Sequence, residues 1–295
     1  MTALLSLPGV PAVYVCHGWL PWQEIPPIFP RILRYVTVDH TTLDRVIYEQ
    51  RIPEEKVRVM FNFVDLKRFQ PRAPLPPKPQ RALIFSNYAH EDYVKTVREA
   101  CARFQIQVDV IGISVGNTTD EPETFLPQYD LVFAKGRSAL EAMAVGNALI
   151  VCDVGHCGPM VSIENFDKLR RLNFGIRTLR TPLTVDNLAA QIEQYSSAES
   201  AEVCRIIRQQ ADLEKTVDQL VNLYEEVIAE YKQLPRPDPL VEMQAAGAYL
   251  QSLSPMLKKV LNGEIPRASI IPAVEAAPQK KKPYLRRVFR AIRGK

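Results

Sequence analysis

Short apolar runs alternate with helical patterns along most of this 295-residue chain, and no other feature constrains its fold as strongly. Runs that are apolar at nearly every position indicate parallel strands whose two faces are both covered by helices. The sequence therefore predicts an α/β protein built on parallel sheet. The expected strands are 12–18, 35–39, 56–62, 82–87, 107–112, 130–134 and 148–153, and the clearest expected helices are 41–50 (capped by Thr41), 90–104, 213–233 and 240–261.

A proline-rich segment interrupts this alternation. Five prolines lie within residues 70–80, and such a segment can enter neither a helix nor a central strand. We therefore expect it to connect two domains. The expected organisation is a first domain over 1–71, a linker over 72–81, a second domain over 82–234, a helical and proline-broken extension over 235–279 and a basic tail over 280–295.

The net charge of +4 comes from the C-terminal tail. Eight of the 37 Lys and Arg residues lie in 280–295, which leaves 29 against 33 Asp and Glu residues in the rest of the chain. A fold that binds nucleic acid usually presents a basic face, whereas the body of this chain is mildly acidic. The sequence therefore predicts no specific nucleic-acid partner.

Cysteine content and the N-terminus indicate the compartment. The five cysteines are an odd number, mostly within strand-like or helix-like runs, which favours reduced, buried thiols over a disulfide framework. Cys152, His156 and Cys157 lie close in sequence but lack a fourth ligand, so no metal site is expected. The first apolar stretch has no basic residue before it, and no run is long enough to cross a bilayer. We expect a cytoplasmic protein.

The segment 131–153 joins two expected strands through a short helix. Gly136 permits a sharp turn, and Lys135 and Arg137 place two cations where the free amides of a helix N-terminus favour an anion. This chemistry suits a diphosphate. The alternative is purely structural: Ser138 and Glu141 have the spacing of a capping box, and Gly146 would end the helix.

Three phrases in this chain resemble those of retaining glycosyltransferases of the GT-B type (group 1, family 4-like). They are "PAVYVCHGW" at 11–19, "KVRVMFNFVDLKRFQP" at 56–71 and "DLVFAKGRSALEAMAVGNALIVCDVG" at 130–155. The resemblance covers roughly 11–233. It implies a complete Rossmann-like C-terminal donor domain, a partial Rossmann-like N-terminal domain on the acceptor side and a helical C-terminal extension.

The resemblance also implies roles for individual residues. Glu141 would hold the ribose hydroxyls of a donor nucleotide, and Gly136, Arg137 and Ser138 would line its diphosphate. Lys135 or Arg137 would neutralise the leaving group. His17 would act at the reaction centre beside the transferred sugar, and Asn87 would lie at a strand end on the donor side. No cofactor is implied beyond the nucleotide-sugar, which is a substrate.

Departures from the family pattern leave more than one function open. Phe133 occupies the position of a glutamate that contacts the donor sugar, and no Lys or Arg lies between Ala82 and Lys95. About seventy residues precede the linker, fewer than a full acceptor domain of this architecture needs, so a second chain supplying the missing half is one expectation.

The function predicted first is transfer of a sugar from a UDP- or GDP-type donor to a cell-surface polysaccharide or lipid-linked acceptor. The alternative is a catalytically impaired nucleotide-binding module that docks a partner or a membrane through its tail. A sugar-nucleotide epimerase, which shares the fold, ranks last.

The tail has the pattern of an amphipathic helix. Its apolar residues recur at helical spacing, at Leu285, Val288, Phe289 and Ile292, and arginines occupy most of the positions between them. Such a helix suits an anionic membrane surface, so peripheral contact at the inner face of the membrane is predicted. The expected contacts are Arg286, Arg287, Phe289 and Arg290. A solvated basic end is the alternative.

Overall fold

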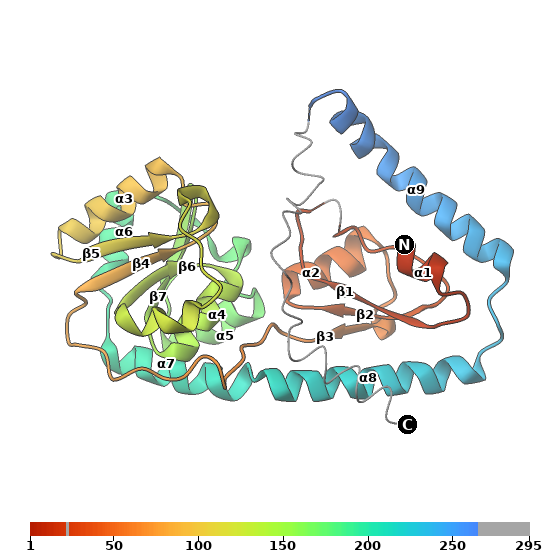
Figure 1. The fold of residues 1–295 in the computed structure, drawn as a ribbon, viewed down its shortest axis with the longest axis horizontal. Coiled ribbons are helices and arrows are strands. Elements are labelled where there is room, and N and C mark those ends of the chain that lie inside the picture. Colours follow the sequence, from red (N-terminus) through yellow and green to blue (C-terminus); the bar gives the residue numbers. More distant parts are fainter. Residues whose placement is uncertain (22–23, 265–295) are drawn as a thin grey trace. The chain divides into compact units, whose positions relative to one another are not determined.

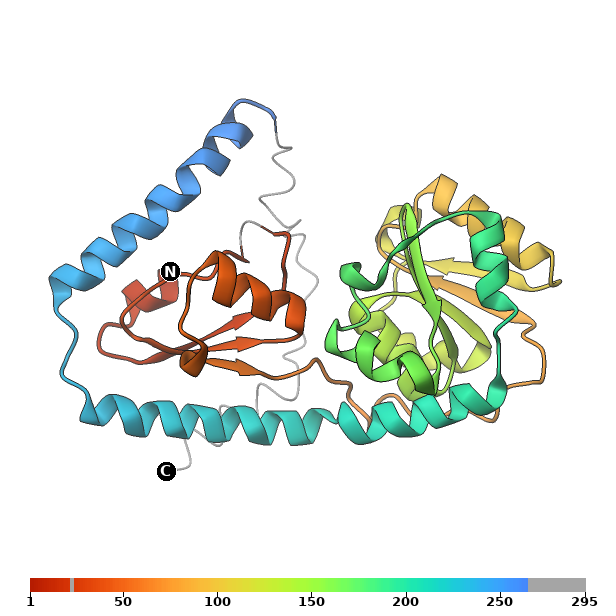
Figure 2. The same cartoon turned by 180° about the vertical axis from the view of Figure 1, so that it is seen from behind.

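The computed structural model describes residues 1–21 and 24–264 of the chain. They form two compact units, which are described separately (Figures 1 and 2). Unit 1 combines Met1–Met60 with the segment from Val217 onward, and unit 2 is Phe61–Thr216. The chain therefore passes from unit 1 into unit 2 and returns.

Unit 1 is built on a parallel sheet with the strand order β1-β2-β3. The central strand is the most buried of the three, and its Tyr35 packs in a core with Cys16, Val46 and Ile52. The strands are β1 (Ala12–Cys16), β2 (Ile32–Thr37) and β3 (Val57–Val59), and the short helices are α1 (Thr2–Ser6) and α2 (His40–Asp44).

The helix expected over 41–50 begins one residue earlier, at His40, and changes from α-helical to π-helical after Asp44. Asp39 caps α2, because its side chain accepts from the Thr42 amide at 2.6 Å and the Thr42 hydroxyl completes a capping box. The expectation that Thr41 is the cap is wrong, since Thr41 is buried inside the helix. After α2 the chain continues as a π-helical turn over Arg45–Glu49. A carboxylate caps as well as a hydroxyl does, so the earlier residue starts the helix.

Two long helices end the described part of the chain. α8 (Leu213–Gln233) has the expected bounds, and α9 (Pro239–Leu261) begins one residue before the expected start. α9 belongs to unit 1: its Glu242 forms an ion pair with Arg31 at 2.6 Å, and its Ala246 lies in the core of that unit.

Unit 2 contains the larger sheet, in the strand order β5-β4-β6-β7-β8-β9. The first four strands in this order are parallel, and β8 and β9 continue the sheet antiparallel. The strands are β4 (Arg81–Phe85), β5 (Gln107–Ile111), β6 (Leu131–Ala134), β7 (Ala148–Asp153), β8 (His156–Met160) and β9 (Thr181–Pro182). The helices are α3 (Glu91–Ala102), α4 (Gly136–Val145), α5 (Ile163–Arg171), α6 (Val185–Ile192) and α7 (Ser197–Gln210). Short 3₁₀ segments cover Glu54–Lys56, Ile113–Val115, Pro122–Thr124, Leu126–Gln128 and Ile176–Thr178.

Alternate residues of the central strands enter two separate cores. Leu83 and Val132 pack with α4, α5 and α7 on one face of the sheet, while Ile84 and Phe133 pack with α3 and α6 on the other. A strand buried on both faces must be apolar throughout, which explains the runs seen in the sequence. The predicted α/β fold with parallel sheets is confirmed, and all five cysteines are free and buried, as expected.

The proline-rich segment does not join the two compact units. The chain crosses between Met60 and Phe61, before this segment, because 61–71 packs on unit 2. Val64 accepts from the Leu213 amide and donates to the Ala211 carbonyl at 2.8 Å, and Phe69 is buried in the unit 2 core. Pro76 accepts a hydrogen bond from the Tyr195 hydroxyl at 2.9 Å. The boundaries of the compact units therefore lie after Met60 and after Thr216, whereas the expected domain boundaries lie at residues 71 and 234.

The buried guanidinium of Arg31 tests what holds unit 1 together. Arg31→Leu leaves its acceptors buried without donors, so we expect the free energy of unfolding to fall by about 3–5 kcal/mol. Urea unfolding measures this loss, and the exposed Arg58→Leu, expected within about 0.5 kcal/mol of wild type, is the control. A loss below about 1 kcal/mol, the scale of a surface ion pair, would contradict the structural role. The acceptors are Glu242 and the carbonyls of Leu4, Leu7 and Val10.

Candidate functional site

The candidate site lies where the strand order of unit 2 reverses. The chain runs from β4 outward to β5 on one side and returns to β6 on the other side of β4. The helices that follow these two neighbouring strands, α3 and α4, cover opposite faces of the sheet. Loops therefore diverge at the carboxyl ends of β4 and β6, and open parallel sheets bind their ligands at such a point.

Lys135 contacts residues at the carboxyl ends of β4 and β7, the strands that flank β6. It comes directly after β6, and its Nζ lies 5.4 Å from the ring centroid of Tyr88, in the turn after β4. The same ammonium group forms an ion pair with Asp153 at the end of β7. The structure therefore brings Lys135 to the switch point, although its charge is already paired.

Glycine is required at two places in these loops. A Cβ on Gly112 would lie 1.8 Å from the backbone oxygen of Ser86, so only glycine lets the ends of β4 and β5 approach this closely. Gly136 has φ of +58°, a conformation that other residues rarely adopt, and its amide donates to the Phe174 carbonyl at 2.9 Å. This bond fixes the first residue of α4.

The capping box expected at Ser138 and Glu141 is wrong. α4 begins at Gly136, with Lys135 as its N-cap and no side chain capping it, so Ser138 is the third helical residue. Glu141 accepts from Nε of Arg137 at 3.0 Å instead of reaching back to the helix start. The expected end of the helix is confirmed, because Gly146 has φ of +103° and its amide closes the last turn.

Glu141 is a buried carboxylate one turn inside α4. Only 8% of the residue is exposed, and this burial raises the pKa of its carboxyl above the usual range. The Arg137 guanidinium lowers the pKa of Glu141 and so opposes this shift. The Arg68 guanidinium, which lies farther away, also lowers it. The side chain of Arg137 is 56% exposed, so the pair joins a buried acceptor to an accessible cation.

Sequence reasoning missed Arg68 as a member of this site. It forms an ion pair with Glu123 at 2.6 Å, donates to the Asp120 carbonyl, and feels the charge of Glu141. The hydrogen bond to Glu123 raises the pKa of Arg68. The signal was present in the phrase at 56–71, but we assigned that phrase to the first domain.

His17 and Asn87 lie in different units, each in the loop that follows a strand. His17 is exposed and follows β1 in unit 1. Asn87 is exposed in unit 2, two residues beyond the end of β4 and not within the strand as expected. Its Oδ1 accepts from the Ile113 amide at 3.3 Å, which ties the loops after β4 and β5 together. The catalytic and donor-binding roles of these residues stay predictions.

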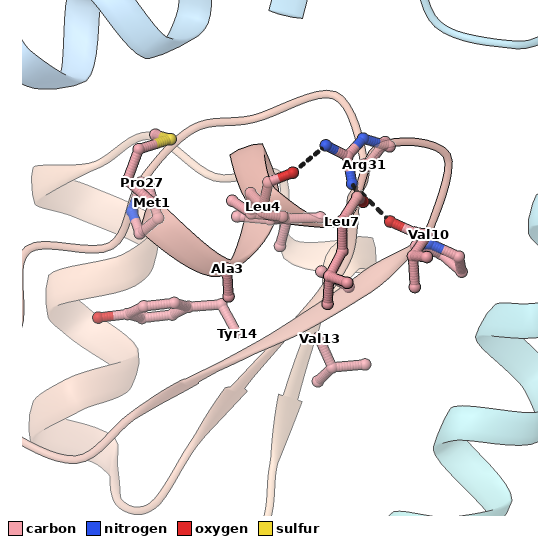
Figure 3. Close-up of a pocket in the computed structure, with 12 residues that line it drawn as sticks. Met1, Ala3, Leu4, Leu7, Val10, Val13, Tyr14, Pro27 and Arg31 are labelled. Carbon is pink, nitrogen blue, oxygen red and sulfur yellow. Dashed lines mark hydrogen bonds between the residues drawn. The ribbon is translucent and has the colours of Figure 1, made fainter. Parts of the chain in front are cut away.

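A separate pocket in unit 1 has the wrong chemistry for a nucleotide (Figure 3). Its volume is about 220 Å³, and it is lined mainly by apolar side chains of α1 and β1, such as Leu4 and Val13. Arg31 also lines the pocket, but its donors are taken up by the carbonyls of Leu7 and Val10 and by other acceptors. The Arg31 guanidinium is therefore not available to a phosphate.

The described residues contain neither a cluster of metal-binding side chains nor a helix that could cross a membrane. Over 1–21 and 24–264, no three His, Cys, Asp or Glu side chains are grouped as metal ligands would be. None of the described helices combines the length and the apolar character needed to cross a membrane. The predicted membrane contacts Arg286, Arg287, Phe289 and Arg290 lie outside the described residues.

Gly136→Ala tests the backbone geometry at the start of α4. The new Cβ would meet open space, so the expected cost is backbone strain alone, about 1–2 kcal/mol in the free energy of unfolding. Gly9→Ala is the matched control, since Gly9 also has positive φ and open surroundings but lies in unit 1. Hydrogen exchange should quicken at the first amides of α4 in Gly136→Ala only. Unchanged exchange and unchanged stability would show that this turn tolerates an L-residue.

No family model and no curated protein matches this chain. Solved structures similar to it include a glycosyltransferase from Rickettsia africae, at 12% identity and a TM-score of 0.49, and the apo form of the lipopolysaccharide outer core galactosyltransferase WaaB, at 14% and 0.41. The likenesses cover 66% and 68% of this chain, which spans 63% and 62% of the respective structures. Both neighbours are glycosyltransferases. Because both TM-scores are below 0.5, the α/β fold of this chain rests on its own two parallel sheets.

Proposed function

We propose that unit 2 binds a nucleotide-sugar of the UDP or GDP type at the carboxyl ends of β4 and β6, and that the protein transfers the sugar to an acceptor. The acceptor we propose is a cell-surface polysaccharide or a lipid-linked glycan. The observation that carries this proposal is the buried Glu141 carboxylate in α4, next to a helix start that lies at the reversal of strand order. The phrase resemblance at 130–155 supports it.

Glu141 has the chemistry to hold a ribose. An ionised carboxylate only accepts hydrogen bonds, and two vicinal hydroxyls can donate one to each oxygen. In the structure one oxygen is taken by Nε of Arg137 at 3.0 Å. Ribose hydroxyls would replace this donor and release the Arg137 guanidinium. Binding of the sugar part would thus prepare a cation for the phosphates.

The diphosphate would be held by the amides that follow Gly136 and by two guanidinium groups. The Gly136 amide is bonded to Phe174, and the Lys135 ammonium group is paired with Asp153. Arg137 and Arg68 are also each paired with a carboxylate, but their side chains are more exposed (56% and 39%) than that of Lys135 (31%). We therefore propose that Arg137 and Arg68 exchange these partners for the phosphates. Cations placed in advance stabilise the negative charge that develops on a departing nucleoside diphosphate.

His17 is the residue of unit 1 that we propose for the reaction centre. It follows β1 at the carboxyl end of a parallel strand, the end at which open sheets carry their functional groups. A second chain that completes the sheet of unit 1 is part of this proposal. We also propose a cytoplasmic location, with the tail at an anionic membrane surface, and no cofactor beyond the donor.

One observation favours the alternative, a nucleotide-binding module without transfer activity. Phe133 stands where the resembled family carries a glutamate that contacts the donor sugar, and its side chain is fully buried in the core shared with α3 and α6. It cannot take over that contact. The module would keep the nucleotide and lose the transfer step, so a chain that binds UDP or GDP but transfers no sugar would support this alternative.

Glu141→Gln tests the ribose contact. Calorimetric titration with UDP and GDP should show at least about a tenfold loss of affinity for the preferred nucleotide, because an amide offers one acceptor in place of two. In wild type, affinity should rise with pH as the carboxyl ionises through its raised pKa, and the Gln variant should lose this dependence. Glu202→Gln, at a half-buried position of α7 where the carboxylate pairs with Arg205, is the control. Equal affinities in all three proteins would refute the site.

The same carboxyl links stability to pH. Because folding raises the pKa of Glu141, ionisation is less favourable in the folded state than in the unfolded chain. Its contribution to stability is therefore greatest below the usual carboxyl pKa and is lost as pH rises through the raised value. Urea unfolding over this pH range should show a smaller decline for Glu141→Gln than for wild type. Parallel curves would contradict the raised pKa.

Arg68→Ala tests the cation that the sequence did not reveal. We expect affinity for UDP or GDP to fall about tenfold, with a smaller effect on the corresponding monophosphate, because a charge-assisted hydrogen bond to a phosphate is lost. Arg205→Ala removes a surface arginine that pairs only with Glu202 on α7 and serves as the control. If both variants bind the diphosphate as wild type does, Arg68 does not contact the nucleotide and only holds the loop around Glu123 in place.

A further inference from the structure

α9 presents a stripe that no other described residue of its unit covers. We call the outer stripe the seven residues Leu240, Met243, Gly247, Leu250, Ser254, Leu257 and Leu261. All seven are exposed, and they follow one another at alternating steps of three and four residues. This is the spacing of the contact positions in a helix that packs lengthwise against another helix.

A different face of α9 packs on unit 1. Glu242 pairs with Arg31, Ala246 is buried in the unit 1 core, and Tyr249 lies close enough to affect the pKa of Tyr14. Long side chains of the outer stripe remain in water: Met243 is 65% exposed and Leu250 61% exposed. A helix of this length with two apolar faces needs two partners, and unit 1 supplies one of them.

We infer that the outer stripe of α9 is the interface for a second copy of this chain, in a symmetric pair of antiparallel helices. The order of side-chain sizes along the stripe complements itself when the twofold axis lies midway between Gly247 and Leu250. Leu250 of one copy then lies opposite Gly247 of the other, and Met243 lies opposite Ser254. A surface that meets its own copy across a twofold axis must be self-complementary in this way.

The small residues define how the two helices fit. In an antiparallel pair centred between Gly247 and Leu250, the Leu250 side chain of one copy lies beside Gly247 of the other. A Cβ built on Gly247 meets no atom of its own chain within 4 Å, so this space is available to a partner. Facing a large residue with a small one lets two helices pack closely without strain.

Charge distribution favours the antiparallel direction. The N-terminal end of α9 carries Asp238, which caps the helix, and the C-terminal end carries the exposed Lys258 and Lys259. An antiparallel pair places the acidic end of one copy beside the basic end of the other and opposes the two helix dipoles. A parallel pair would place like charges together.

The stripe fits a second helix better than it fits a lipid surface. Binding of a helix to a membrane grows with the apolar area that it buries, so a small residue at two of seven stripe positions weakens it. The same two residues strengthen a helix pair by allowing close approach. This inference goes beyond the proposed function and does not depend on it, since α9 contributes no residue to the site in unit 2.

Sedimentation velocity of the full chain tests the dimer. We expect concentration-dependent association over about 1–100 µM, because a single helix pair is at the small end of specific interfaces. Leu250→Glu should raise the dimer dissociation constant at least about tenfold, while Ala248→Glu, with the same charge two residues away and outside the stripe, should change it little. A wild type that stays monomeric over this range would overturn the proposal.

Two further variants separate the possible occupants and directions. Gly247→Leu should weaken the dimer, because it fills the space for Leu250; if the stripe binds lipid, it should instead strengthen sedimentation with vesicles of anionic phospholipid. Leu240→Cys and Leu257→Cys, which face each other across the proposed axis, should cross-link to each other when mixed and not to themselves. Self-cross-linking of each variant would show a parallel pair. Vesicle binding by a monomeric protein, lost in Leu250→Glu, would assign the stripe to the membrane.

Discussion

The pairing of β4 with β6 is the constraint on which the candidate site depends. Because these neighbouring strands lead into helices on opposite faces, their loops diverge and leave backbone amides and polar side chains at one edge of the sheet. The register is fixed by two cores at once. A slip of one residue would exchange Leu83 and Ile84 between them, so the position of Lys135 beside Tyr88 is fixed by packing.

Within this frame, one buried carboxylate organises the local electrostatics. Glu141 loses solvation, which raises its pKa, and Arg137 and Arg68 recover part of that cost. Arg68 reaches the site because the segment 61–71 packs on unit 2, through the backbone bonds of Val64 and the buried ring of Phe69. The site is therefore assembled from segments about seventy residues apart in sequence.

Much of the fold could be predicted from periodicity, whereas the starts of α2 and α4 could not. β7 and α8 have their predicted bounds because long apolar patterns admit only one reading. The start of α4 was wrong because a hydrogen bond from the Gly136 amide to Phe174, nearly forty residues later, selects it over the capping box at Ser138. The antiparallel β8 and β9 were not predicted, since short strands with Gly and Pro leave little periodic signal.

The sequence by itself determined the α/β class and the parallel strands, because burial on both faces of a sheet leaves a pattern that is local in the chain. It also held the outer stripe of α9, whose spacing is local too. Only the tertiary structure decided which side chains share a site: that Lys135 is paired with Asp153, that Arg68 joins Glu141, and that Phe133 is sealed in a core. These are contacts between segments distant in sequence, and no local pattern specifies them.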